Sequence, residues 1–198
     1  MFLFSKPSRQ TIDDFLASVR ESNFTYPCIG KTKDGFKRSP KRKDTMSYNV
    51  DHNVKVIGRG EGDFEKAKDA IREWKMFDIP WVQICWPGTP IEEGRNVAIL
   101  ISHFGFYSLN AARIVYTIDK WDWFGFAYGT LESHGESGEE RFSVRLDRET
   151  GDVLYDLYAF SRPNYLSARL AYPLTRSLQR RFASDSLAAM NRSVRGDV

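Results

Sequence analysis

After Pro80 the chain contains six consecutive strand-like segments with no helical segment between them. Each is rich in β-branched and aromatic residues, and turn-forming residues separate it from the next. A parallel pair of strands needs a long crossover connection, so strands that follow one another this closely pair in antiparallel fashion. The pattern therefore predicts an antiparallel meander. The expected strands cover residues 81–86, 96–103, 111–118, 123–131, 139–147 and 152–160.

Three other segments have helical periodicity, and one more has the pattern of a strand. Apolar residues recur every three or four positions in residues 11–20, 63–77 and 165–190, whereas residues 48–57 end in alternation. Pro173 lies inside the last helical segment, so we expect a kink or a break there. This order of elements predicts an α+β fold in which a curved antiparallel sheet of about seven strands grips a long C-terminal helix.

Alternation within two strands predicts which side chains face inward. Glu140 shares its face with Phe142, Val144 and Leu146, while the residues between them are mostly polar. In the strand at 123–131, aromatic residues alternate with glycine and alanine. We expect the aromatic face to point inward, and something must approach the small-residue face closely or leave it bare.

Length and composition favour a single domain that spans residues 1–198. An N-terminal helix and a basic loop, at about residues 8–47, are expected to precede the core. The longest apolar stretch is far shorter than a membrane span, and Ser5-Lys6-Pro7 interrupts the apolar start before it could form a signal peptide. We therefore expect a cytoplasmic protein.

The sequence predicts neither a metal site nor a cofactor. Cys28 and Cys85 cannot form a disulfide framework, and the histidines lack the spacing of metal ligands. The glycines at 58, 60 and 62 do not match a nucleotide-binding loop, and the carboxylate of Asp63 would repel phosphate, whereas it suits a helix N-cap.

Several strings of residues along the chain carry a family resemblance. They are Phe24-Thr-Tyr-Pro27, Gly125-Phe-Ala-Tyr-Gly-Thr-Leu131, Gly138-Glu-Glu-Arg-Phe-Ser-Val144, Ala159-Phe-Ser-Arg-Pro163 and Leu178-Gln-Arg-Arg181. In this order they resemble the family of uncharacterised proteins catalogued as domain of unknown function nineteen-ninety, in the START-like (helix-grip) superfamily. The resemblance implies a helix-grip fold, in which a cavity commonly remains beside the terminal helix, and it implies no established activity. A long basic insertion, around residues 33–47, departs from the family pattern.

Polar candidates gather near the turn at residues 131–140. Glu140 is expected at the rim of the apolar interior, and His134 with Glu139 or Glu140 could act as a general base. The alternative is that these side chains satisfy backbone donors in a tight turn, which we favour. Arg162, held in extended backbone by the proline after it, would clamp a carboxylate of a ligand or of the same two glutamates.

A pocket between the sheet and the terminal helix would be lined by aromatic residues and a few polar groups. Aromatic residues at strand spacing are also typical of an ordinary core, and this alternative stays open. The residues expected to bind a ligand are Trp81, Tyr116, Tyr128, Thr130, His134, Glu139, Glu140, Tyr158 and Arg162.

Three functions compete at this point. The leading hypothesis is a binding protein for a small apolar or amphipathic molecule. The second is an acid–base enzyme, of the hydrolase, cyclase or isomerase type, that uses His134 with Glu139 or Glu140. The third is an interaction module for an anionic surface, such as a membrane, through the basic loop at 31–43. That loop has no aromatic residue except Phe36, which argues against nucleic acid as the partner.

Overall fold

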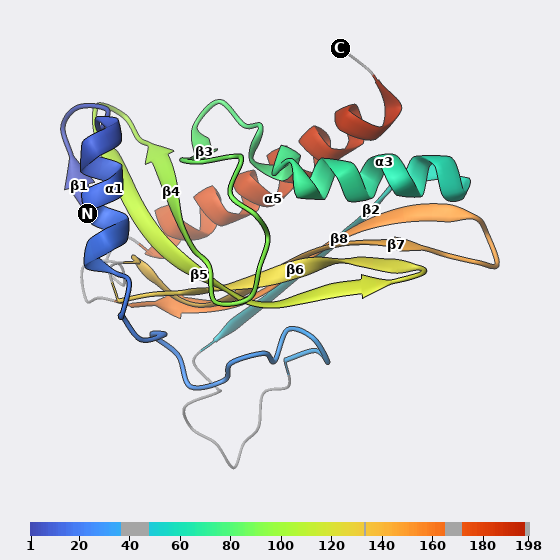
Figure 1. The fold of residues 1–198 in the computed structure, drawn as a ribbon, viewed down its shortest axis with the longest axis horizontal. Helices are drawn as coiled ribbons and strands as arrows, with labels where there is room; N and C mark the ends of the chain where they lie inside the picture. Colours follow the sequence, from blue (N-terminus) through green and yellow to red (C-terminus); the bar gives the residue numbers. More distant parts are fainter. Residues whose placement is uncertain (37–47, 133, 165–171, 197–198) are drawn as a thin grey trace.

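A computed structural model describes residues 1–36, 48–132, 134–164 and 172–196. An eight-stranded sheet dominates the fold (Figure 1). Its strands are β1 (Phe2–Leu3), β2 (Asn49–Arg59), β3 (Val82–Ile84), β4 (Asn96–Ser102), β5 (Tyr107–Lys120), β6 (Trp123–Thr130), β7 (Glu136–Leu146) and β8 (Asp152–Pro163). Their order is β2-β8-β7-β6-β5-β4-β3, with β1 paired to β5, and every pair is antiparallel. The predicted antiparallel meander is confirmed.

The helices are α1 (Arg9–Ser18), α3 (Gly60–Arg72), the 3₁₀ helix η1 (Lys75–Phe77) and α5 (Tyr172–Arg195). The expected helices over 11–20 and 63–77 begin earlier than predicted, at Arg9 and Gly60. The Ser8 hydroxyl caps α1 by accepting from the backbone N–H of Thr11 at 3.1 Å. Asp63 lies inside α3 and is not its N-cap residue, although its carboxylate accepts from the backbone N–H of Arg59 at 2.9 Å. The expected helix over 63–77 is interrupted at Trp74, whose left-handed backbone (φ 57°) separates α3 from η1.

Pro173 was expected to kink or break a helix that began near residue 165, but it lies at the start of the described helix. The described helix α5 begins at Tyr172, so Pro173 occupies its first turn, where a missing backbone donor costs little. Residues 165–171, where the expected helix began, lie outside the described residues. The apolar periodicity of residues 165–190 predicts a buried stripe that includes Leu174, but Leu174 is exposed, whereas Ala189, Met190 and Val194 are buried. Within the described ranges, no helix is both long enough and apolar enough to cross a membrane.

One face of the sheet, which we call the inner face, is covered by α3 and α5 (Figure 1). The strands direct Phe126, Phe142 and Tyr155 to this face, where they are fully buried together with Ile71 of α3 and Met190 of α5. Burial of each such side chain stabilises the fold by about 1.5–3 kcal/mol. The main core of the protein therefore lies between the inner face and these two helices.

The segment at residues 24–36, which we call the strap, covers part of the opposite face, which we call the outer face, and α1 packs on another part of it. The strap crosses the sheet on the side away from α3 and α5 (Figure 1). The backbone N–H of Thr25 donates to the carbonyl of Thr130 at 3.0 Å, and the N–H of Phe36 donates to the Tyr158 hydroxyl at 2.8 Å. Phe36 also stacks on Phe160, with ring centroids 4.2 Å apart. The strap and the outer face thus enclose a second, smaller core.

The small-residue face of β6 is not bare. The strap residue Tyr26 packs against Gly129 so closely that a Cβ atom at position 129 would overlap its hydroxyl group. Close approach to this face was one of the two expected alternatives, and the structure shows that the strap provides it.

Candidate functional site

Tyr128 and Glu140 form a polar pair on the inner face. They lie directly opposite each other on β6 and β7, and the Tyr128 hydroxyl donates to Glu140 Oε2 at 2.8 Å. Strand alternation places them beside Phe126 and Phe142, so the expectation that Glu140 shares a face with Phe142 is confirmed. The pair is a polar group at the edge of an otherwise apolar core.

Burial changes the chemistry of this pair. It raises the pKa of Glu140 to about 7, because a carboxylate loses hydration energy there, although the hydrogen bond from Tyr128 opposes the shift. Burial and the neighbouring Glu140 carboxyl also raise the pKa of Tyr128 well above its ordinary value. Near neutral pH the Glu140 carboxyl is therefore divided between its protonated and ionised forms, and it can donate or accept a hydrogen bond.

A second polar group lies on the inner face beneath α5. Arg176 of α5 forms a bidentate ion pair with Asp51 of β2, at 2.6 and 2.7 Å, and donates to Gln179 Oε1 at 2.6 Å. Gln179 also donates to the Ser161 hydroxyl at 3.1 Å. Burial raises the pKa of the nearby Glu136 to about 7, although Ser161, Arg176 and Gln179 favour its ionised form and oppose the shift. Three carboxyl groups, those of Asp51, Glu136 and Glu140, thus lie on the inner face.

His134 is bound within its turn. Its Nδ1 accepts from the backbone N–H of Glu136 at 3.0 Å, and its carbonyl accepts from the side chain of Asn164 at 3.0 Å. Burial lowers the pKa of His134 to about 4, so the ring is neutral at pH 7 and Nε2 carries the proton. These contacts favour the interpretation of His134 as a residue that stabilises the turn.

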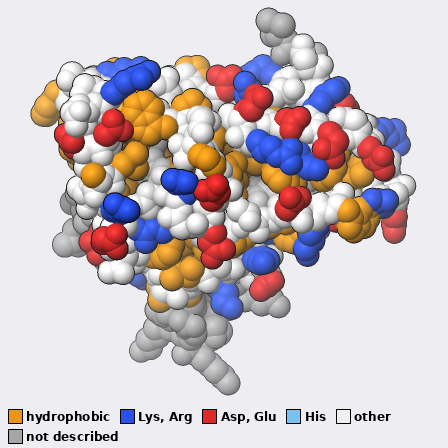
Figure 2. Space-filling model, viewed as in Figure 1, with side chains coloured by type: hydrophobic (Ala, Val, Ile, Leu, Met, Phe, Trp, Pro, Cys, Tyr) orange, Lys and Arg blue, Asp and Glu red, His pale blue; other side chains and the backbone are white. Residues whose placement is uncertain are grey.

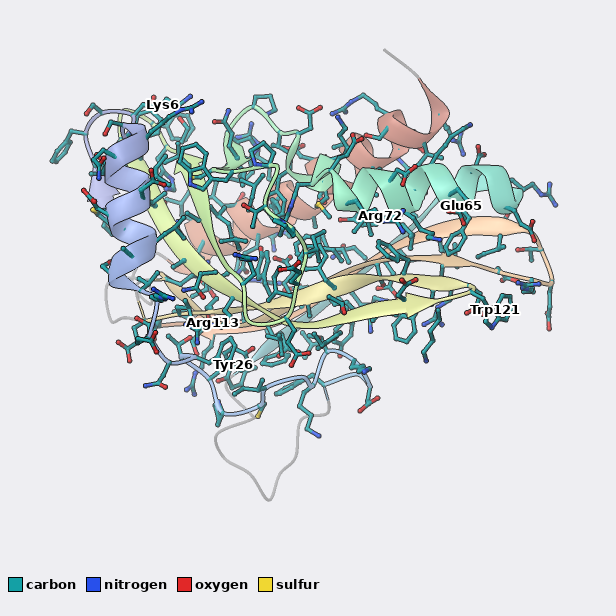
Figure 3. The ribbon with its side chains drawn as sticks, viewed as in Figure 1. Lys6, Tyr26, Glu65, Arg72, Arg113 and Trp121 are labelled. Atoms are coloured by element: carbon teal, nitrogen blue, oxygen red, sulfur yellow. The ribbon has the colours of Figure 1, made fainter. Side chains whose placement is uncertain are left out.

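Glu139 points to the outer face, on the other side of the sheet from Glu140. Its carboxylate accepts from the Tyr26 hydroxyl at 2.8 Å, from the backbone N–H groups of Gly30 and Thr32 at 2.6 and 2.9 Å, and from the Thr32 hydroxyl. These four hydrogen bonds join β7 to the strap. In Figure 3 the labelled Tyr26 lies on this side of the sheet.

Three other candidates also lie on the outer face. The Tyr116 hydroxyl hydrogen-bonds Thr32 at 2.7 Å, Tyr158 accepts from Phe36, and the Arg162 guanidinium lies 4.7 Å from the ring centre of Tyr48. The part of the basic loop at 31–36 belongs to the strap, whereas its remainder, within 37–47, lies outside the described residues. The expected ligand residues are therefore divided between two faces of the sheet.

The last two candidates lie at other positions. Thr130 hydrogen-bonds Thr25 of the strap at 2.6 Å and accepts from the backbone N–H of Gly138 at 2.9 Å. Trp81 lies against the main core and donates from Nε1 to Asp185 of α5 at 2.8 Å. The structure thus brings Tyr128 and Glu140 together beneath the helices, and holds Trp81 at a separate contact with α5.

Sequence reasoning missed the inner-face residues Asp51, Glu136, Ser161, Arg176 and Gln179. Alternation along β7 could have found Glu136, because it has the same parity as Glu140. The others depend on the pairing of β2 with β8 and on the placement of α5. Among the described residues, no group of three or more histidine, cysteine, aspartate or glutamate side chains is arranged to hold a metal ion.

A family model described as Domain of unknown function (DUF1990) matches residues 25–189. The chain belongs to this family. A UPF0548 protein of Dictyostelium discoideum is 38% identical over 207 residues, which cover 98% of this chain and 96% of that protein. The DUF1990 resemblance seen in the sequence is confirmed.

Solved structures with little sequence identity share the fold of this DUF1990 protein. The hypothetical protein jhp0584 of Helicobacter pylori has a TM-score of 0.51 at 13% identity, covering 79% of this chain and 94% of that one. Ara h 8.0201 has a TM-score of 0.50 at 14% identity, covering 76% of this chain and 99% of that one. The fold is the helix-grip fold, and such distant likenesses carry no information on activity.

Proposed function

We propose that this DUF1990 protein binds a small apolar or amphipathic molecule between the inner face and α5, with Tyr128 and Glu140 contacting its polar end. One observation carries the proposal. Glu140 is a largely buried carboxyl group among aromatic side chains, and in the described part of the chain no lysine or arginine forms an ion pair with it. An unpaired acid in such a place is costly for folding and is typical of a binding site.

The charges of the inner face favour a guest molecule whose polar end is a hydrogen-bond donor. Arg176 pairs with Asp51, and its charge also favours the ionised form of Glu136, whereas no described lysine or arginine forms an ion pair with Glu140. A hydroxyl or amine group would donate to Glu140, whereas a carboxylate would be repelled by the ionised form. We therefore propose an amphipathic guest whose polar end is a hydrogen-bond donor.

Aromatic side chains restrict where the guest can lie. Phe182 of α5 packs 5.6 Å from Phe77 and 6.4 Å from Phe142, measured between ring centres, so the middle of the inner face is occupied by protein. Tyr128 and Glu140 lie beside this cluster. We propose that the guest binds at the Glu140 end of the helix, and that the partly buried Phe182 ring moves to admit its apolar part.

Native mass spectrometry of freshly purified protein, compared with a denatured extract, tests the proposal by detecting a co-purified molecule. A fluorescent alkylamine should bind at least about tenfold more tightly than a fatty acid of the same length, since only the amine can donate to Glu140. Glu140→Gln should reduce this preference, whereas Glu65→Gln on the outward side of α3 should leave it unchanged (Figure 3). Absence of both a co-purified molecule and alkylamine binding would falsify the proposal.

The pH dependence of stability offers a test of the Glu140 environment. Its pKa is raised from 4.5 to about 7 on folding, so the folded state binds more protons than the unfolded state between these values. The contribution of Glu140 to stability should therefore fall as pH rises from 4.5 to 7. In Glu140→Gln this loss should be smaller by about 2 kcal/mol, allowing for partial exposure of the side chain.

Urea unfolding of both proteins at several pH values measures this difference. Glu65→Gln is the matched control, because Glu65 is exposed and forms only a surface pair with Lys68. Identical pH slopes in wild type and Glu140→Gln would show that Glu140 titrates normally in the folded protein.

An acid–base enzyme is the second candidate, and Glu140 is the residue that favours it. A carboxyl group with a pKa near the working pH is suited to proton transfer. His134 and Glu139 support it less, because His134 Nδ1 is occupied by a backbone N–H and Glu139 is bound to the strap. Turnover of a captured guest that is lost in Glu140→Gln would favour this function over simple binding.

A further inference from the structure

Two adjacent segments expose phenylalanine side chains at one end of the molecule. Phe4 and Phe104 are 96% and 95% exposed and Phe2 is 76% exposed, while the ring of Phe106 lies 6.0 Å from that of Phe2. We call these four residues the phenylalanine patch. Pairing of β1 with the start of β5 brings the two segments together. Soluble proteins seldom expose so many large apolar side chains side by side, so the patch indicates a contact surface.

The patch protrudes from the fold. Phe104 lies in the turn between β4 and β5, which is closed by a hydrogen bond from the backbone N–H of His103 to the Phe106 carbonyl at 2.8 Å. Gly105 supplies the positive φ of 90° that this turn requires. Phe4 follows β1 directly. Single protruding rings of this kind can insert into the acyl chains of a lipid layer, whereas a protein partner would need a complementary pocket for each ring.

The two segments that carry the patch contain basic residues and no acidic ones. No aspartate or glutamate occurs in residues 1–12 or 94–118, which contain the patch, and Lys6 and Arg9 follow Phe4 closely. The Arg9 guanidinium lies 5.5 Å from the ring centre of the half-buried Trp86. Lys6 lines a pocket of about 120 Å³ together with Trp81, Ser102 and Tyr107. Aromatic rings next to lysine and arginine are typical of residues at a membrane interface.

We propose that the phenylalanine patch docks on a lipid bilayer that contains anionic phospholipids. Phe4 and Phe104 enter the acyl region, while Lys6 and Arg9 contact the headgroups. In Figure 2, hydrophobic side chains at the end of the molecule that carries β1 and α1 lie beside both basic and acidic ones, and Figure 3 labels Lys6 there. A second copy of the chain fits less well, because a symmetric contact through this patch would bring the lysines and arginines of both copies together. The proposal is independent of the guest beneath α5.

Co-sedimentation with vesicles tests the proposal on the full chain. Wild-type protein should bind vesicles of phosphatidylcholine and phosphatidylserine in equal parts more strongly than vesicles of phosphatidylcholine alone. The double variant Phe4→Ser with Phe104→Ser should weaken binding at least about tenfold, because both rings lose their insertion energy. Lys6→Gln should weaken binding to the anionic vesicles by about fivefold and leave binding to phosphatidylcholine unchanged.

Trp121→Ser is the matched control, since Trp121 is 63% exposed at the opposite end of the molecule (Figure 3). This variant should bind vesicles like wild type. The phenylalanine and tryptophan variants should unfold at the wild-type temperature, because the replaced rings are exposed. Three results would overturn the proposal. They are no vesicle binding by wild type, unchanged binding by the double phenylalanine variant, and patch-dependent self-association without vesicle binding.

Discussion

Replacing Glu139 with alanine should lower the free energy of unfolding by about 4 kcal/mol, the largest effect expected in this protein. The carboxylate is 2% exposed and accepts hydrogen bonds from Tyr26, Gly30 and Thr32 of the strap. Alanine would leave these donors buried without an acceptor, and each would lose its hydration without compensation. Equilibrium unfolding in urea measures the loss.

Hydrogen exchange can show where the Glu139→Ala protein is weakened. The backbone amides of Gly30 and Thr32 should lose protection, while amides in the middle of α5 keep theirs, because the strap and α5 lie on opposite faces. Glu140→Ala is the matched control on the inner face, and it should leave the strap amides protected. If Gly30 and Thr32 stayed protected in Glu139→Ala, the strap would have to be held by its aromatic contacts instead.

Gly129→Ala should lower the free energy of unfolding by about 3 kcal/mol, an unusual result for such a small change. The added Cβ would overlap the Tyr26 hydroxyl and lie 2.8 Å from two of the ring carbons. Tyr26 cannot turn aside freely, because it is 3% exposed and its hydroxyl is bound to Glu139. Movement of Tyr26 would therefore cost both packing and a charge-assisted hydrogen bond.

A double-mutant cycle separates these two costs. Tyr26→Phe removes the hydroxyl and its bond to Glu139, so adding Gly129→Ala to it should cost less than adding Gly129→Ala to wild type. Gly62→Ala is the control, since Gly62 is exposed in α3 with no atom near the added Cβ, and it should change stability by about 0.5 kcal/mol or less. Additive effects at positions 26 and 129 would mean that the two residues do not share this contact.

The strap also connects the strings of residues that carry the DUF1990 resemblance. Tyr26 belongs to the first string, Gly129 to the second and Glu139 to the third, and the three residues are in mutual contact through Tyr26. Strings far apart in the chain thus build one structural feature on the outer face. These three strings hold the strap on the outer face, and two of them also carry Tyr128 and Glu140 of the candidate site on the inner face.

Part of the candidate site followed from periodicity. Alternation along β7 placed Glu140 with Phe142, and alternation along β6 placed Tyr128 with Phe126. The outer-face positions of Tyr116 and Tyr158 did not follow from their sequence, because an aromatic residue suits either side of a sheet that is covered on both faces. Glu139 was grouped with Glu140 by proximity in sequence, although neighbouring residues in a strand point in opposite directions.

The sequence alone determined the antiparallel meander and the approximate positions of the helices, because periodicity and turn residues act locally along the chain. Strings of residues along the chain indicated the family. Tertiary structure decided that the strap covers the outer face and that Arg176 and Gln179 of α5 meet Asp51 and Glu136 on the inner face. These contacts join residues more than 30 positions apart, and only the packing of whole elements brings them together.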